Sequence, residues 1–392
     1  MRTIDQFNFN GKKAIIRVDF NVPFYNNLVA DNSRIKAAKK TIDKVCNDGG
    51  SCILVSHLGR PKGFQKDFSM IKIINEVENV LERKVFLSKD VIGADSKTKA
   101  ANLKPNQVLL LENVRFHNEE IEGDHCFAKK LSIMADCYIN DAFGTAHRAH
   151  ASTTVIAGFF EDKFFGKCLE SEVNSIKKVL KNGEKPVLAI LGGAKISSKI
   201  PILKNIIKIA DNVIIGGGMA FTFAKAMGGK IGTSIHEDSM LETTKDIIER
   251  SKKMNVKVYI PIDVVCSKEF DNRSPKKVFD IMDINPEYQG MDAGPKSLDL
   301  FKKVVMSSKT ILWNGPLGVF EFSNFSIGTK MLGEFIANST KNGAFSLVGG
   351  GDSVAAVKKF KIENKMSYVS TGGGAMLESL EGKNLPGINA LL

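Results

Sequence analysis

The segment NDAFGTAHRAHAST, residues 140–153, concentrates basic side chains in a way that could hold an anion. His147, Arg148 and His150 lie within four residues, with alanines beside and between them. Small side chains let a ligand approach the backbone, and Arg can hold phosphate or carboxylate with two parallel hydrogen bonds. The alternative is a solvated basic turn, because runs of charge are usually surface features.

Other apolar runs of the first half also end in basic residues. These ends read RVDFNVP (17–23), SHLGRPKG (56–63), ENVRFHNEE (112–120) and GTAHRAH (144–150), while NSRIKAA (32–38) opens a helix. If the runs are parallel strands, their carboxyl ends share the sheet edge where ligands bind. The side chains expected to converge there are Arg17, Arg34, Arg60, Arg115, Arg148, His57 and His147. The sequence predicts a small-anion pocket, in which Asp19 and Asn21 could hydrogen-bond a hydroxyl of a bound acid.

The second half carries glycine where the first half carries Arg. Its apolar runs end in LGGAKISSK (191–199), IGGGMAFTF (215–223), WNGPLGVFE (313–321), VGGGDSVAAV (348–357) and STGGGAMLE (370–378). Glycine-rich exits into helices expose backbone N–H groups and the positive end of the helix dipole, which suits polyphosphate. Neither GxxxxGK[ST] nor GxGxxG occurs, which disfavours a P-loop enzyme and a standard dinucleotide dehydrogenase. Tight packing of helix on sheet is the alternative for any single glycine run.

Three further features of the second half could serve a nucleotide. Asp352 follows three glycines at a predicted helix start, where one carboxylate beside phosphate oxygens suits Mg²⁺; a helix cap is the alternative for Asp352 and Ser353. Lys195 and Lys199 are spaced i, i+4, which predicts one helical face directed at the same phosphates. Glu321 could accept hydrogen bonds from ribose hydroxyls.

Short apolar runs alternate with helical segments along the whole chain, which predicts an α/β fold with parallel sheets. A chain of 392 residues exceeds what one core usually organises, so we expect two domains. The stretch 169–185, LESEVNSIKKVLKNGEK, has helical spacing of apolar residues and is predicted to connect them.

The composition limits the classes of function. The net charge of +12 and pI of about 9.2 indicate attraction to acidic substrates or polyanions. Only nine of the 55 basic residues are Arg, and seven of these precede residue 150, which favours geometric recognition of a small anion over a nucleic-acid surface built from Lys. The six cysteines form no CxxC pair, and the first 20 residues contain no apolar leader segment. We therefore expect a cytoplasmic protein with unpaired thiols and no membrane association.

Nine motifs, taken together and in order, resemble the phosphoglycerate kinase family over essentially the whole chain. They are RVDFNVP, SHLGRPKG, LLENVRF, NDAFGTAHRAH, GGAKISSK, GGGMAFTF, WNGPLGVFE, GGGDS and STGGGA. The resemblance implies reversible Mg²⁺-dependent phosphoryl transfer between ATP and the carboxylate of 3-phosphoglycerate, giving ADP and 1,3-bisphosphoglycerate in glycolysis and gluconeogenesis. It also implies a monomer with hinge closure, whose partners are these substrates and not nucleic acid.

The resemblance further implies two Rossmann-like domains, joined by the connecting helix 169–185 and a hinge. The glycerate-binding domain would span 1–168, with 376–392 returning to it, and the nucleotide-binding domain would span 186–375. Glycerate binding is implied for Asp19, Phe20, Asn21, Arg34, His57, Leu58, Gly59, Arg60, Arg115, His147 and Arg148. Nucleotide binding is implied for Lys199, Gly217, Gly218, Gly290, Asn314, Glu321, Gly350, Gly351, Asp352 and Ser353, with Asp352 on the metal.

The expected catalytic groups align and neutralise charge on the transferring phosphoryl group. They are Arg34, Lys195, Lys199, Gly372, Gly373 and Gly374. Two positions depart slightly from the family pattern: Ser353, where Thr is also common, and Met376, where a smaller residue is usual. The alternatives are another small-acid kinase, an NAD-linked enzyme, which the missing GxGxxG disfavours, and a nucleic-acid-binding protein.

Overall fold

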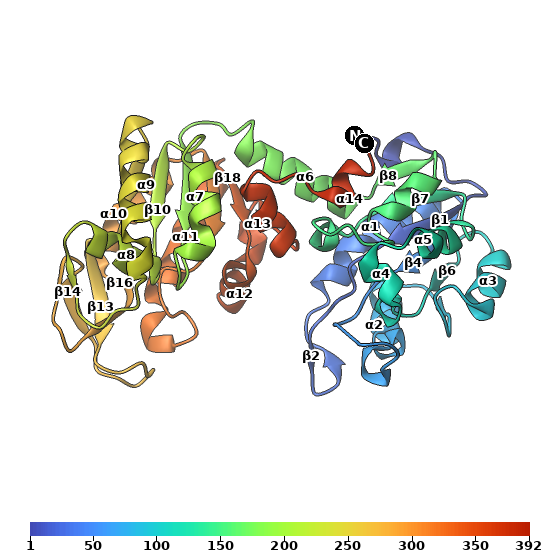
Figure 1. Ribbon diagram of the computed structural model, residues 1–392, viewed down its shortest axis with the longest axis horizontal. Helices are drawn as coiled ribbons and strands as arrows, with labels where there is room; N and C mark the ends of the chain where they lie inside the picture. The colour runs from blue at the N-terminus through green and yellow to red at the C-terminus, as the bar shows by residue number, and fades with distance from the viewer. The chain divides into compact units, whose positions relative to one another are not determined.

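The computed structural model describes residues 1–392, and the chain forms two compact units. Unit 1 comprises residues 1–174 and 384–392, so both chain ends belong to it, and unit 2 comprises residues 175–383 (Figure 1). Each unit contains one six-stranded parallel sheet with helices on its faces. The predicted α/β fold with two Rossmann-like units is therefore confirmed.

The sheet of unit 1 has the strand order β5-β6-β4-β1-β7-β8. Its strands in chain order are β1 (Lys13–Arg17), β4 (Ser51–Val55), β5 (Val85–Leu87), β6 (Val108–Leu110), β7 (Cys137–Asn140) and β8 (Lys163–Phe165). Arg17 pairs with Val55 on one side and with Asn140 on the other, so β1, β4 and β7 end in register. The residues that follow these strands consequently start from the same edge of the sheet.

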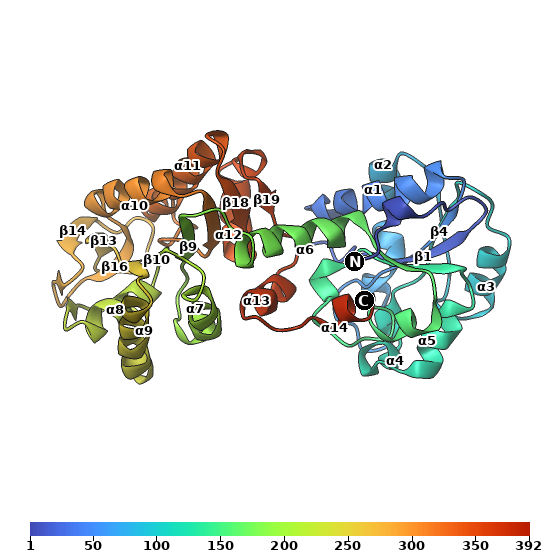
Figure 2. The ribbon, with the colours of Figure 1, turned by 90° about the horizontal axis from the view of Figure 1, so that it is seen from above.

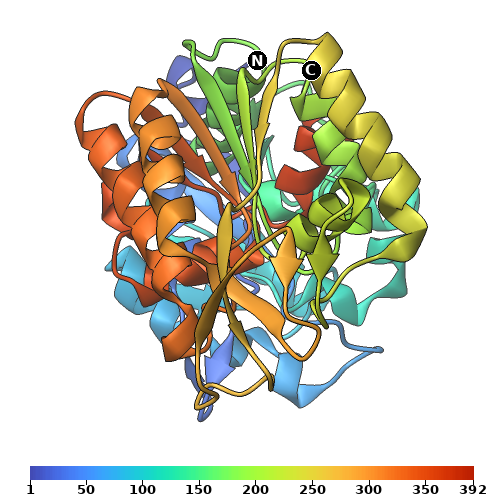
Figure 3. The same cartoon turned by 90° about the vertical axis from the view of Figure 1, so that its left-hand side faces the viewer.

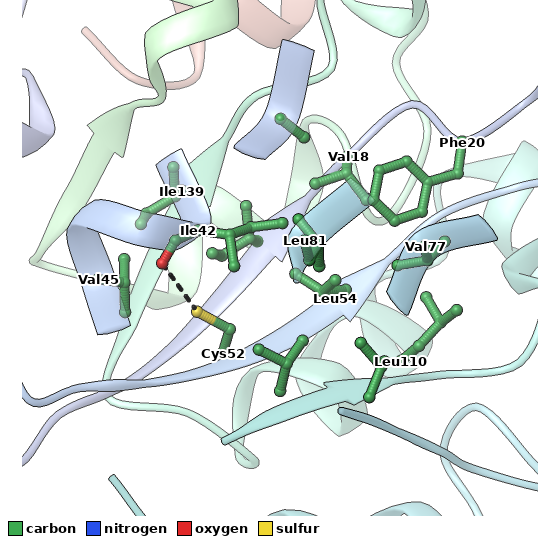
Figure 4. Close-up of a cluster of buried hydrophobic side chains, with 14 of the residues drawn as sticks. Val18, Phe20, Ile42, Val45, Cys52, Leu54, Val77, Leu81, Leu110 and Ile139 are labelled. Atoms are coloured by element: carbon green, nitrogen blue, oxygen red, sulfur yellow. Dashed lines mark hydrogen bonds between the residues drawn. The ribbon is translucent and has the colours of Figure 1, made fainter. Parts of the chain in front are cut away.

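Helices cover both faces of this sheet, with α1 and α2 on one face and α4 and α5 on the other (Figure 2). The helices are α1 (Ser33–Asn47), α2 (Ile74–Leu81), α3 (Ala94–Ala101), α4 (Asn118–Glu122), α5 (His125–Ser132) and α14 (Pro386–Asn389), and a short hairpin joins β2 (Phe24–Tyr25) to β3 (Leu28–Val29). Figure 4 shows the core beneath α1 and α2, where Ile42 and Leu81 pack with Leu54 of β4. Burial of such apolar side chains holds the strand ends in place.

The sheet of unit 2 has the strand order β12-β10-β9-β17-β18-β19. Its strands are β9 (Val187–Leu191), β10 (Asn212–Ile215), β12 (Lys257–Tyr259), β17 (Thr310–Asn314), β18 (Phe345–Val348) and β19 (Tyr368–Val369). A three-stranded antiparallel sheet of β13 (Asp263–Ser267), β14 (Lys277–Asp280) and β16 (Gln289–Ala293), and a pair of β11 (Lys230–Ile231) and β15 (Asp283–Ile284), accompany it.

Helices α10 and α11 lie on one face of the large sheet of unit 2, and α8 and α9 lie on the other (Figures 2 and 3). The helices of the unit are α7 (Ile200–Ile206), α8 (Met219–Ala226), α9 (Leu241–Lys253), α10 (Pro295–Ser307), α11 (Ile327–Lys341), α12 (Gly351–Lys359) and α13 (Gly374–Leu380). Trp313, the only tryptophan, is fully buried with Phe301 and Leu332 in the core on the α10–α11 side.

The predicted connecting helix exists as α6 (Lys167–Leu180), and the boundary between the two units falls within it. It begins and ends earlier than the predicted 169–185. The early start has a local cause: Asp141 Oδ1 accepts hydrogen bonds from the amides of Cys168 (2.8 Å) and Leu169 (3.2 Å), and so caps the first turn.

The chain returns to unit 1 at Asn384, whereas the sequence placed this return at 376. Helix α13 remains with unit 2, because Asn205 of α7 donates a hydrogen bond from Nδ2 to the carbonyl of Leu380 (2.8 Å). The last residues then join unit 1, where the amide of Gly387 donates to the carbonyl of Ala146 (2.8 Å). No helix combines the length and the apolar character needed to cross a membrane.

Candidate active site

The basic residues predicted for unit 1 follow β1, β4, β6 and β7, and the structure brings most of them together at the carboxyl edge of the sheet. Arg17 is the last residue of β1 and is almost fully buried. His57 follows β4, Arg115 lies in a short 3-10 turn after β6, and Arg148 follows the turn after β7. This convergence arises because four parallel strands end side by side.

Asp19, Asn21 and Arg34 form one linked group beside β1. Arg34 lies in the first turn of α1, and its guanidinium NH1 is 3.1 Å from Asp19 Oδ2 and 2.9 Å from the carbonyl of Asn21. The side-chain oxygen of Asn21 accepts a hydrogen bond from the amide of Gly59 (2.8 Å). The residues after β1 therefore orient the Arg34 guanidinium, whose other N–H groups can bind a ligand.

Gly59 and Arg115 form a second linked group. Arg115 donates from NH1 to the carbonyl of Gly59 (2.6 Å), and its own amide donates to Asn113 Oδ1 (3.0 Å). Gly59 has φ of +63°, and a Cβ there would lie 2.2 Å from the ring of Phe68, so this turn requires glycine. Arg60 follows as an exposed side chain.

The remaining predicted residues of unit 1 differ in what they offer a ligand. Arg148 is half-buried and donates from Nε to His147 Nε2 (3.2 Å). Phe20 and Leu58, in contrast, are buried in the apolar core (Figure 4 shows Phe20), and the amide of Phe20 donates to Ser56 Oγ (2.8 Å). These two side chains therefore support the strand exits and do not face solvent.

The electrostatics of this edge favour an anion. Burial, and then the charges of Arg17 and Arg148, lower the pKa of the Arg115 guanidinium to about 10. Burial, and then the charge of Arg17, lower the pKa of His57 well below its ordinary value, and burial and Arg115 lower the pKa of His150 to about 4. The cations repel one another in a partly dry site, and a bound anion relieves that repulsion.

Unit 2 has a pocket of about 330 Å³ at the carboxyl edge of its large sheet. The predicted nucleotide residues that line it are Gly217, Gly218, Gly290, Glu321 and Asp352. Phe221, Ile235 and Phe270 form an apolar wall, the kind of surface on which a flat heteroaromatic ring packs. Glycine at position 290 leaves room for the Phe221 ring, because a Cβ there would lie 2.0 Å from it.

The two glycine runs that follow β10 and β18 serve different purposes. The amide of Gly216 donates to the carbonyl of Leu191 at the end of β9 (2.8 Å), and that of Gly217 donates to the carbonyl of Leu317 in the loop after β17 (3.0 Å), so both serve packing, the alternative for a glycine run. Gly351, in contrast, begins α12, is exposed, and has open space where a Cβ would be. First-turn amides have no acceptor within their helix, so α12 offers the stronger anion site.

Lys199 and Asn314 form the polar end of unit 2's site. Lys199 Nζ donates to Asn314 Oδ1, and Asn314 Nδ2 donates to the carbonyl of Gly349 (2.6 Å). Burial lowers the pKa of the Lys199 ammonium, against the opposing charge of Asp352. Ser353 is fully buried, and its hydroxyl oxygen accepts a hydrogen bond from the amide of Gly315 (2.5 Å). The hydroxyl thus links the start of α12 to the loop after β17.

The predicted common helical face of Lys195 and Lys199 is wrong. Lys195 is exposed before a 3-10 turn, Ser197–Lys199, and α7 begins only at Ile200. Pro201 explains the break, since proline fits the first turn of a helix and not its interior.

The run Gly372–Gly374 leads into α13. The amide of Gly372 donates to Ser370 Oγ (3.1 Å), whereas Gly373, with φ of +48°, has open space where a Cβ would be. Met376 is fully buried against Gly349, where a Cβ would lie 1.7 Å from the Met376 sulfur. The larger side chain at 376 thus packs α13 onto the loop after β18.

The sequence did not identify three buried carboxylates near the two sites. Glu120 is fully buried beneath the basic edge of unit 1, and Asp141 caps α6. Asp292 lines the pocket of unit 2, where burial raises its pKa to about 7. Glu120 and Asp141 lie within motifs quoted above and Asp292 lies two residues after Gly290, but nothing in the sequence distinguishes a buried carboxylate from an exposed one.

A metal cofactor has few candidate ligands in this chain. No group of three or more His, Cys, Asp or Glu side chains could hold an ion by itself. Asp352 supplies one exposed carboxylate next to the start of α12. One carboxylate beside nucleotide phosphates and water is the coordination that Mg²⁺ accepts in kinases, so the donor set fits a metal that arrives with a nucleotide.

Comparisons with known proteins agree with these features over nearly the whole chain. The family model described as phosphoglycerate kinase matches residues 4–383. The phosphoglycerate kinase of Porphyromonas gingivalis is 50% identical to this chain, and the alignment covers 99% of each chain. The phosphoglycerate kinase of Chloroherpeton thalassium is 44% identical, and the alignment covers 100% of this chain and 98% of the relative. The solved structure of the phosphoglycerate kinase from Coxiella burnetii matches with a TM-score of 0.91 at 38% identity, covering 99% of this chain and 98% of that chain.

Proposed function

The chain belongs to the phosphoglycerate kinase family, and from this premise we propose how its residues transfer a phosphoryl group between ATP and the carboxylate of 3-phosphoglycerate. Unit 1 binds the glycerate and unit 2 binds the nucleotide. The observation that carries this assignment is the convergence of buried Arg17 and Arg115 with half-buried Arg148 at one sheet edge, where burial, and then the charges of Arg17 and Arg148, lower the pKa of Arg115.

In unit 1, the phosphate of 3-phosphoglycerate is bound by Arg60, Arg115 and Arg148, with His147 beside them. The fork geometry of Arg suits a phosphate dianion. Asp19 and Asn21 contact the hydroxyl of the glycerate, and Arg34, oriented by its contact with Asp19, reaches the carboxylate. The carbonyl of Gly59 accepts a hydrogen bond from Arg115 and so orients its guanidinium at the site.

In unit 2, the base of the nucleotide lies against Phe221 in the pocket, and Glu321 accepts hydrogen bonds from the ribose. The phosphates meet the first turn of α12 at Gly350, Gly351 and Asp352. When bound, Mg²⁺ would be held by Asp352 and would neutralise charge on the nucleotide phosphates.

The acceptor chemistry explains why neither site has a nucleophile activated by a base. A carboxylate is already ionised at neutral pH and needs no proton removed before it attacks. What the reaction requires is alignment and cancellation of charge on the group in flight, which we assign to Arg34, Lys195, Lys199 and the amides of Gly373 and Gly374. Gly372 contributes to the turn, since its amide is already bonded to Ser370.

The residues assigned to the two substrates belong to different units. The proposal therefore includes hinge closure, which brings the substrates together and excludes the water that would otherwise hydrolyse ATP. It further includes action as a monomer in the cytoplasm, where glycolytic kinases work.

The test is a coupled assay with purified protein, ATP and 3-phosphoglycerate, with and without added Mg²⁺. We expect ADP formation that requires both substrates and stops when a chelator removes the metal. ADP formation that does not depend on 3-phosphoglycerate would contradict the assigned reaction, and full activity in excess chelator would contradict the role of Mg²⁺.

A further inference from the structure

We propose that Glu120 is a positioning residue for glycerate binding in unit 1. Through Ser152 and Arg17, it fixes which ring nitrogen of His57 carries the proton. The inference rests on the proposed function, because His57 lies after β4 at the basic edge of unit 1, where we propose that the glycerate binds.

The chain of contacts begins at the Glu120 carboxylate, which α4 holds fully buried. Its Oε1 accepts a hydrogen bond from Ser152 Oγ (2.6 Å), and its Oε2 accepts one from the amide of Ser152 (2.8 Å). Burial raises the pKa of Glu120, against the opposing charge of Arg17 and these two hydrogen bonds. The backbone amide and the hydroxyl of Ser152 thus both donate to Glu120, which keeps its carboxylate ionised and in a fixed orientation.

The next link runs from Ser152 to Arg17. Arg17 Nε lies 2.8 Å from Ser152 Oγ, and a guanidinium can only donate. The Ser152 hydroxyl must therefore accept a hydrogen bond from Arg17 and donate its own hydrogen bond to Glu120. The other end of the guanidinium is held at NH1 by the carbonyl of Val18 and, at 3.5 Å, by that of Val55.

The last link fixes the imidazole. Arg17 NH2 lies 3.2 Å from His57 Nδ1, so the same rule makes Nδ1 an acceptor. Burial and the charge of Arg17 lower the pKa of His57, which keeps the ring neutral at pH 7. A neutral imidazole has one protonated nitrogen, so the proton is on Nε2. Asp19 Oδ1, at 4.0 Å from Nδ1, is too distant to favour the other tautomer.

This direction of hydrogen bonds matters for an anionic substrate. With the proton on Nε2, His57 presents a donor, whereas the other tautomer would present a lone pair that repels an oxyanion. Arg17 is a fixed part of the cluster and Glu120 is its buried counter-charge. Arg17 and Glu120 therefore set the tautomer of the His57 ring before the substrate binds.

The experiment compares Glu120→Gln and Ser152→Ala with the wild-type enzyme and with Thr153→Val. Glutamine keeps the shape, but in either orientation its NH2 group faces one of the two Ser152 donors. Ser152→Ala removes the middle link and leaves the carboxylate in place. Thr153→Val is the matched control, because Thr153 is an equally buried neighbour whose hydroxyl lies outside this chain of contacts.

Two readouts are measured on each protein that folds. Long-range ¹⁵N–¹H spectra of the histidine rings report which nitrogen of His57 is protonated, and steady-state kinetics give KM for each substrate. We expect His57 protonated at Nε2 in the wild type and the control, and a mixture of tautomers in both test variants. KM for 3-phosphoglycerate should rise about tenfold, as loss of one charge-assisted hydrogen bond allows, with KM for ATP unchanged.

An unchanged tautomer in both variants overturns the inference, whatever happens to KM, and so does a changed tautomer with unchanged KM. His57→Ala separates this failure from failure of the proposed site. If His57→Ala raises KM for 3-phosphoglycerate but the Ser152 and Glu120 variants leave the tautomer intact, the site stands and the positioning role does not. If His57→Ala has no effect on KM, the placement of His57 in the glycerate site is wrong.

Discussion

Asp141→Asn should make the stability of unit 1 less dependent on pH. Asp141 is almost fully buried next to β7, where Oδ1 accepts the first amides of α6. Burial raises the pKa of this carboxyl from 3.8 to about 7, against hydrogen bonds from Thr41, Leu169 and Cys168. The folded state therefore binds more protons than the unfolded state between these two values, and the free energy of unfolding falls as pH rises through that window.

The magnitude follows from the two pKa values. One pKa unit corresponds to about 1.36 kcal/mol, so the ionisation of Asp141 lowers the free energy of unfolding by about 2.5 kcal/mol between pH 5 and pH 8. Asparagine cannot ionise, so the variant lacks this slope. Any fixed effect of the new amide group shifts the curve at all pH values and leaves the slope difference intact.

The assay is urea unfolding at several pH values, followed by far-UV circular dichroism and by tryptophan fluorescence. Trp313 belongs to unit 2, so fluorescence reports that unit, and circular dichroism reports both. Asp292→Asn is a matched control, because burial raises the pKa of Asp292 to about 7 in unit 2. Parallel stability curves for the wild type and Asp141→Asn from pH 5 to pH 8 would refute the reasoning.

Four substitutions test the assigned roles in catalysis and binding, and a fifth tests packing. Arg34→Lys keeps the charge but loses the planar pair of N–H donors, so steady-state kinetics should show kcat lowered at least about tenfold with little change in KM. Arg148→Lys should instead raise KM for 3-phosphoglycerate and leave kcat unchanged. Equal effects of the two substitutions would contradict the assignment. Lys199→Ala should lower kcat about a hundredfold without weakening 3-phosphoglycerate binding, and wild-type turnover would remove Lys199 from the catalytic set. Gly351→Ala fills open space at the start of α12, so calorimetry should show Tm unchanged or slightly raised while KM for ATP rises. Gly290→Ala should lower stability by about 1–3 kcal/mol through a clash with a buried ring, and an unchanged Tm would contradict this packing.

The sequence predicted the architecture wherever apolar runs ended in distinctive residues. Strands such as β4 and β7 are buried at every position, so their continuous apolar runs were recognisable, and the basic or glycine-rich ends marked the carboxyl edges of both sheets. The antiparallel sheet of β13, β14 and β16 was not predicted, because β14 is mostly exposed and has no apolar run. Its position beside the pocket follows from tertiary contacts alone.

The candidate sites were predictable in composition but not in their internal contacts. The convergence of Arg17 and Arg115 followed from strand order, whereas Glu120 resembled any acidic residue in the first turn of a helix. The spacing of Lys195 and Lys199 suggested one helix, but the chain forms a 3-10 turn there before Pro201. The burial of Glu120 depends on residues distant in sequence, whereas the break before α7 has a local cause in Pro201.

The central claim is that the acid substrate binds unit 1 and the nucleotide binds unit 2. Separate titrations with 3-phosphoglycerate and with MgADP, followed by amide ¹H–¹⁵N NMR spectra of the whole chain, test it most directly. We predict that 3-phosphoglycerate shifts the amide signals of Gly59, Arg60 and Arg148, and that MgADP shifts those of Gly290 and Gly351. Shifts from 3-phosphoglycerate confined to the pocket of unit 2, or from MgADP confined to the basic edge of unit 1, would contradict the account.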